Sequence, residues 1–243
     1  RKDKPIYYYI NNNEHEKEDL SFILQKWGEC YFKDLQKLAT SIDITNIDYL
    51  DMLYNKIEES KILCAENETI RGVNSINQMM IKSFINKKVI TSLDNYFPGE
   101  IMMVKKNNNL LSLYNGDSGL LVTIKGDHTL YFMVKKSSIS ASKDGYVKNN
   151  IFKIASYVFY PLRMISQKEI DFAYAITIHK SQGSDYKNIL VILPKQLGHP
   201  LINRQIVYTA ITRTKGNTYL FSSQPILEAA RDTLIQRDTN IDL

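Results

Sequence analysis

The chain has 243 residues, of which 44% are hydrophobic and 23% are charged, and its formal net charge is +5. No apolar run approaches the roughly 20 residues needed to cross a bilayer, so the composition excludes a helical membrane protein and is typical of a globular one. Cys30 and Cys64 are isolated and lack the spacing of a metal site, which predicts reduced thiols in the core of a cytoplasmic protein.

The first part of the chain predicts helices and then an α/β unit. Residues 18–60 carry apolar side chains at helical spacing, beginning with Leu20 and Leu24. The short apolar run at 61–65 predicts a buried strand, and the periodicity of 73–84 predicts a helix. A strand followed directly by a helix is the unit of a parallel α/β sheet.

Residues 98–165 have a different pattern, in which short β-type runs alternate with turn residues such as Asn115, Gly116 and Asp117. This pattern predicts a small antiparallel barrel or sheet inserted into the chain. The segment 95–170 also carries ten basic and five acidic side chains. That charge favours a surface for polyanions and, equally, a solvated lysine-rich face.

From residue 172 onward, strands alternate with helices again. The predicted strands are 173–178, 188–194 and 217–223, and the predicted helices are 201–214 and 225–236. Such an alternation is typical of a parallel sheet, which binds its ligands at the carboxyl ends of the strands.

Two polar clusters stand out in this last part. The stretch AITIHKSQGSDY (175–186) follows a strand, and VYTAITRTK (207–215) places Arg213 near the end of a helix. We expect both clusters to converge on the carboxyl edge of the sheet. Arginine suits a γ-phosphate, because its guanidinium is always charged and binds two oxygens at once. Yet the phosphate-loop pattern G-x-x-x-x-G-K-[ST] is absent from the 243 residues.

The two clusters resemble motif V and motif VI of superfamily 1 helicases. Within that superfamily, residues 61–235 are similar in order and spacing to RecD, the alpha subunit of exodeoxyribonuclease V. The resemblance implies an α/β fold, the second RecA-like motor domain, with an inserted SH3-like antiparallel β-barrel. In such helicases the first motor domain carries the phosphate loop, so its absence here is expected.

The resemblance also implies nucleotide-side roles. Arg213 matches the arginine finger, which stabilises charge on the γ-phosphate during hydrolysis. Gln182 and Gly183 match the loop that approaches the nucleotide, and a glycine permits close backbone approach. Asp185 occupies a position where many relatives carry a glutamate that in some of them touches the ribose. ATP and Mg²⁺ are implied for the full-length protein, with neither bound tightly by this fragment.

Four further residues of the first cluster are interpreted on the DNA side. Thr177 and His179 match positions that face single-stranded DNA. Lys180 and Ser181 either contact phosphate or hold the loop. Metal ligands are not predicted.

The predicted organisation has four parts: a helical segment (1–60), the start of the motor domain (61–95), the inserted barrel (96–168) and the rest of the motor domain with both motifs (169–243). The implied function is that of a 5′→3′ DNA helicase fragment in double-strand break repair and recombination. Its partners would be DNA, RecB, RecC and the first RecA-like domain. Two alternatives stay open: another superfamily 1 helicase, and a non-catalytic binding module for nucleic acid or protein, which would not need both Arg213 and Gly183.

Overall fold

The computed structural model describes residues 6–10, 16–86, 96–136, 145–147 and 150–233. None of the helices in these ranges is long and apolar enough to cross a bilayer. The chain divides into two compact units. Unit 1 comprises 1–21, 60–76 and 175–243, and unit 2 comprises 22–59 and 77–174. These boundaries group residues 22–59 with the inserted segment, whereas the four-part division remains a prediction.

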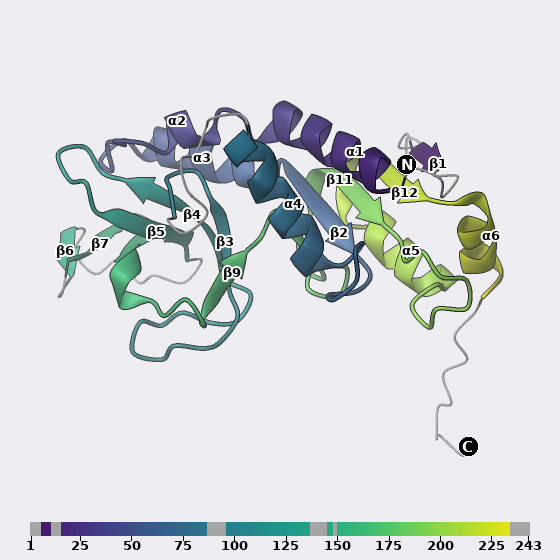
Figure 1. The fold of residues 1–243 in the computed structure, drawn as a ribbon. Coiled ribbons are helices and arrows are strands. Elements are labelled where there is room, and N and C mark those ends of the chain that lie inside the picture. Colours follow the sequence, from purple (N-terminus) through teal and green to yellow (C-terminus); the bar gives the residue numbers. More distant parts are fainter. Residues whose placement is uncertain (1–5, 11–15, 87–95, 137–144, 148–149, 234–243) are drawn as a thin grey trace, which may run out of the picture. The chain divides into compact units, whose positions relative to one another are not determined.

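Unit 1 is built on a parallel sheet of five strands in the order β1-β12-β11-β2-β10 (Figure 1). The strands are β1 (Ile6–Ile10), β2 (Ser60–Cys64), β10 (Ala175–Thr177), β11 (Tyr186–Ile192) and β12 (Thr214–Ser222). The parallel α/β architecture predicted for 61–65 and for 172 onward is thereby confirmed. Strand β1 was not predicted.

Helices α5 (Arg204–Ile211) and α6 (Gln224–Asp232) begin at residues that suit the first turn of a helix. Helix α5 starts after Asn203, whose side chain accepts a hydrogen bond from the Ile206 amide at 2.9 Å. Helix α6 has Pro225 in its first turn. Proline has no amide hydrogen, but the amides of the first turn have no partner within the helix, so no helical hydrogen bond is lost. Helix α4 (Val73–Asn86) follows β2 as predicted.

Unit 2 contains an antiparallel sheet of seven strands in the order β6-β7-β8-β5-β4-β3-β9. Its strands are β3 (Ile101–Val104), β4 (Ser118–Thr123), β5 (Leu130–Lys135), β6 (Gly145–Val147), β7 (Ile151–Ile154), β8 (Tyr157–Pro161) and β9 (Ile170–Phe172). A single 3₁₀ turn at Leu162–Met164 follows β8. The antiparallel insertion predicted for 98–165 is confirmed, and its closure into an SH3-like barrel stays a prediction.

The helices of the N-terminal half are α1 (Glu16–Tyr31), α2 (Leu35–Leu38) and α3 (Ile47–Glu58). Helix α3 is tied to the antiparallel sheet through Asp51. Its carboxylate accepts a hydrogen bond from the Tyr157 hydroxyl at 2.5 Å and forms an ion pair with Lys135 at 2.7 Å. Tyr157 is fully buried, so this contact fixes the helix against β8 and β5.

A carboxyl group and a thiol are buried in the packed regions of the two units. Glu100 precedes β3 with 1% of its surface exposed, and it accepts a hydrogen bond from the Phe97 amide at 3.2 Å. Because burial penalises the charged carboxylate, the pKa of Glu100 is raised to about 8. Cys64 is buried and Cys30 is exposed, and both thiols are free. The core position predicted for Cys30 is therefore wrong.

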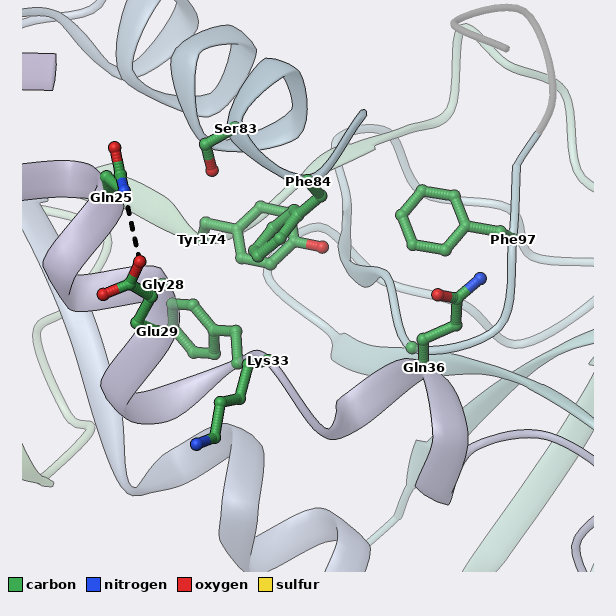
Figure 2. Close-up of a pocket in the computed structure, with 11 residues that line it drawn as sticks. Gln25, Gly28, Glu29, Lys33, Gln36, Ser83, Phe84, Phe97 and Tyr174 are labelled. Atoms are coloured by element: carbon green, nitrogen blue, oxygen red, sulfur yellow. Dashed lines mark hydrogen bonds between the residues drawn. The ribbon is translucent and has the colours of Figure 1, made fainter. Parts of the chain in front are cut away.

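Unit 2 also contains a pocket of about 50 Å³ between α1, α2, α4 and the start of β3 (Figure 2). Phe32, Phe84 and Tyr174 meet at one side of it, with ring centroids 5.3 and 5.5 Å from the tyrosine. Two of its polar members are bonded to each other, since the Gln25 amide donates to the Glu29 carboxylate at 3.1 Å. The pocket contains none of the residues that the sequence singles out as functional.

Candidate functional site

The first polar cluster begins where β10 ends. Thr177 is the last residue of that strand, and a tight turn follows immediately. The turn is closed by two hydrogen bonds to Thr177: the Lys180 amide donates to its hydroxyl at 3.2 Å and the Ser181 amide to its carbonyl at 3.2 Å. This turn brings Thr177, His179 and Lys180 together at the carboxyl edge of the sheet. His179 and Lys180 are exposed there.

Ser181 differs from its neighbours, because its side chain is completely buried. Its hydroxyl donates to the Ile178 carbonyl at 2.6 Å, and its own carbonyl accepts from the Ser184 amide at 3.0 Å. A hydroxyl that is buried and already donates its hydrogen to a backbone carbonyl cannot contact a phosphate. Of the two interpretations, loop-holding is therefore the one that this structure favours, and the prediction of Ser181 as a DNA contact is corrected.

Replacement of Ser181 by alanine should lower the free energy of unfolding by about 1–2 kcal/mol, because the buried Ile178 carbonyl loses its donor. Urea denaturation of residues 1–243 measures the effect. Ser184→Ala is the matched control, since that residue is exposed and should change stability by less than about 0.5 kcal/mol. Equal stability of the two variants would contradict the loop-holding role.

The chain then crosses to the opposite edge of the sheet. Thr177 pairs with Cys64, and Cys64 pairs with Ile192, so Thr177 is level with the last residue of β11. The first residue of β11, Tyr186, lies at the other edge of the sheet. Six residues of strand separate these two levels, which at about 3.3 Å per residue is roughly 20 Å. Asp185, which directly precedes β11, is therefore near the amino edge, whereas Gly183 lies between the two edges, in a turn closed by the hydrogen bond from the Ser184 amide to the Ser181 carbonyl at 3.0 Å.

Arg213 lies at this amino edge as well. It directly precedes β12, and the Tyr186 amide donates to its carbonyl at 2.8 Å. The predicted convergence of both clusters on the carboxyl edge is thus wrong. The physical reason is that Arg213 precedes its strand whereas Thr177 ends one, and all the strands are parallel.

The half-buried guanidinium of Arg213 is oriented by the end of α5. Its Nε donates to the Thr209 carbonyl at 3.3 Å, and its Nη2 donates to the Thr212 hydroxyl at 3.3 Å. Gly183, in the connection between β10 and β11, has φ +88°, and an added Cβ there would meet no atom within 4 Å. The backbone at Gly183 is therefore open to close approach by a ligand. Gln182 is exposed in the same connection.

The amino edge also contains an ion pair between Lys215 and Asp185 at 3.3 Å, which the sequence did not predict. Asp185 thus has a cation partner from β12. No local sequence signal announces the pair, since its members are 30 positions apart. The described residues contain no group of three or more His, Cys, Asp or Glu side chains that could hold a metal ion.

Residues 172–221 match the profile of the UvrD-like helicase C-terminal domain, and this range includes all eight predicted site residues. The RecBCD enzyme subunit RecD of Buchnera aphidicola subsp. Acyrthosiphon pisum is 27% identical over 228 residues, which are 92% of this chain and 33% of that protein. The chain is similar to RecD subunits. The RecD subunit of Haemophilus influenzae is 22% identical over 86% of the chain and 29% of its own length.

The chain spans about a third of the length of these RecD relatives. Among solved structures, the Pif1 helicase from Bacteroides in complex with ADP-AlF3 and ssDNA is 16% identical, with a TM-score of 0.37. That similarity covers 85% of this chain and 49% of the Pif1 chain.

Proposed function

We propose that the chain is the second RecA-like motor domain of an ATP-dependent DNA helicase of the RecD type, with the antiparallel sheet of unit 2 as an SH3-like barrel. The observation that carries the proposal is the position of Arg213 beside Tyr186, where the connection from β10 enters β11 at one edge of the parallel sheet. Similarity to RecD over most of the chain supports it.

The proposed ATP side is formed by Asp185 and Arg213 at the amino edge, together with Gln182 and Gly183 from the connection between β10 and β11. Phosphoryl transfer depends on positioned positive charge, because the transition state spreads charge over the γ-phosphoryl oxygens. The hydrogen bonds from Arg213 to Thr209 and Thr212 leave the guanidinium oriented before ATP arrives, so it acts as an arginine finger without reorganisation. Mg²⁺ and the phosphate loop would come from the first motor domain.

The carboxyl edge is the proposed single-stranded DNA side, with Thr177, His179 and Lys180. An exposed lysine and an exposed imidazole suit a phosphate backbone. ATP and DNA would thus bind at opposite ends of the β10–β11 connection. In the complete protein we propose 5′→3′ movement, RecB and RecC as partners, and a role in double-strand break repair and recombination in the cytoplasm.

The chain by itself should not hydrolyse ATP, because it holds half of a nucleotide site and no G-x-x-x-x-G-K-[ST] loop. Phosphate release from residues 1–243 should stay at background with and without single-stranded DNA. The full-length protein, measured in parallel, should show DNA-stimulated release. Stimulated turnover by residues 1–243 would contradict the proposal, and so would a full-length protein that DNA does not stimulate.

A further inference from the structure

The amino edge contains a β-bulge that carries a second cation, Lys215, two residues after Arg213. Tyr186 pairs with Thr214 and Asn188 pairs with Asn217, so Lys187 of β11 faces two residues of β12, Lys215 and Gly216. Bulges are frequent beside active sites, where they redirect a side chain.

Buried polar contacts fix this bulge. The hydroxyl of Thr214, which is 2% exposed, donates to the Lys187 carbonyl at 3.0 Å and accepts from the Gly216 amide at 3.1 Å. Gly216 is required there, since a Cβ would lie 2.4 Å from the Lys187 carbonyl oxygen. The backbone that carries Lys215 is therefore well defined, although its side chain is on the surface.

Lys215 itself is held weakly. Its side chain is 73% exposed, that of Asp185 is 47% exposed, and their atoms are 3.3 Å apart. Exposed ion pairs add little to stability, so breaking this one requires little free energy. A multiply charged anion can therefore replace Asp185 as the partner of Lys215. A rigid backbone with a loosely held ammonium, two residues after Arg213, is suited to a ligand that brings its own negative charge.

We propose that Lys215 is a second phosphate-binding residue of this site, which contacts the terminal phosphate of ATP together with Arg213 and pairs with Asp185 in this structure. The inference rests on the function proposed above and adds to it a residue that discriminates a nucleoside triphosphate from a diphosphate. Lysine suits this task, because its ammonium is a flexible point charge that follows a phosphate, whereas Arg213 is already oriented.

The test measures binding of a non-hydrolysable ATP analogue and of ADP to the full-length protein by calorimetry. Lys215→Met should raise the Kd for the analogue about tenfold and the Kd for ADP less than about twofold. Lys215→Arg keeps the charge and should recover analogue binding. Lys195→Met removes an exposed lysine beyond the carboxyl end of β11 and serves as the charge-matched control, with no change expected.

Asp185→Asn separates a phosphate contact from a merely structural pair. It breaks the same ion pair, so a structural role predicts the same binding loss as Lys215→Met. The proposal predicts instead that the preference for the analogue over ADP is kept in Asp185→Asn and lost in Lys215→Met. Unchanged analogue binding by Lys215→Met, or equal loss of both nucleotides, overturns the proposal.

The outcome is independent of the test of the site itself. If Arg213→Ala abolishes hydrolysis while Lys215→Met binds the analogue normally, the helicase function stands and the role of Lys215 falls. If Arg213→Ala hydrolyses ATP normally, the assignment of a nucleotide site to this edge is wrong, and the assignment of Lys215 is then wrong as well.

Discussion

Arg213→Ala in the full-length protein should reduce DNA-stimulated ATP hydrolysis by about 10³- to 10⁵-fold, the effect typical of an arginine finger. The cause is electrostatic, because a guanidinium oriented by Thr209 and Thr212 stabilises charge that develops in the transition state. Arg213→Lys should restore little, since an ammonium lacks the bidentate fork. Steady-state phosphate release measures both variants.

The same substitution should leave the fold intact. Helix α5 packs through the buried Ile206 and Ala210, and the alanine variant loses the two side-chain hydrogen bonds of the arginine while keeping its backbone hydrogen bonds. We expect a loss of about 1 kcal/mol of unfolding free energy. Arg231→Ala, on the exposed side of α6, is the matched control and should hydrolyse ATP normally. Near-normal turnover by a folded Arg213→Ala protein would mean that the arginine-finger assignment is wrong.

Glu100→Gln should stabilise residues 1–243 at pH 8.5 by about 2–4 kcal/mol and change stability by less than about 1 kcal/mol at pH 4.5. The pKa of Glu100 is raised by burial from 4.5 to about 8 in the folded chain. Glutamine keeps an acceptor for the Phe97 amide and removes the ionisation.

The sign follows from where each state releases its proton. Below about 4.5 the carboxyl is protonated in both states. As the pH rises from 4.5 toward 8, the unfolded chain loses the proton and the folded chain retains it, so wild-type stability falls, and above 8 the loss is complete. Urea denaturation across this range measures the difference. Glu18→Gln, at an exposed position of α1, should show no such pH-dependent gain, and a parallel pH profile for both variants would contradict the buried ionisation.

Local patterns predicted the elements well where one face of an element is buried. Leu20 and Leu24 are at most 1% exposed, as helical spacing indicates, and the apolar run at 61–65 coincides with β2. Strand β1 escaped prediction, because its five residues offer no alternation and its partner β12 lies some 200 positions later. Parallel pairing at that separation leaves no local trace.

The arrangement of the candidate site differs from the one that the sequence predicted. Arg213 follows a helix and precedes a strand, an order that already assigns it to the amino edge of a parallel sheet, whereas the Thr177 turn follows a strand. The burial of Ser181 could not be read from a polar sequence. The bulge at Lys215 and Gly216 depends on register between two strands, which single-sequence patterns do not contain.

Strand β1 has a practical consequence for handling the protein. It covers one side of β12 over five residues, from Ile6 opposite Thr218 to Ile10 opposite Ser222, and Tyr7 stacks on Tyr219 with ring centroids 5.0 Å apart. A shortened version that starts after Ile10 would turn β12 into a bare edge, with unpaired amides and carbonyls open to any neighbouring chain. Versions prepared for crystallisation should therefore retain residues 6–10, or carry a charged substitution on β12, if they are to stay monodisperse.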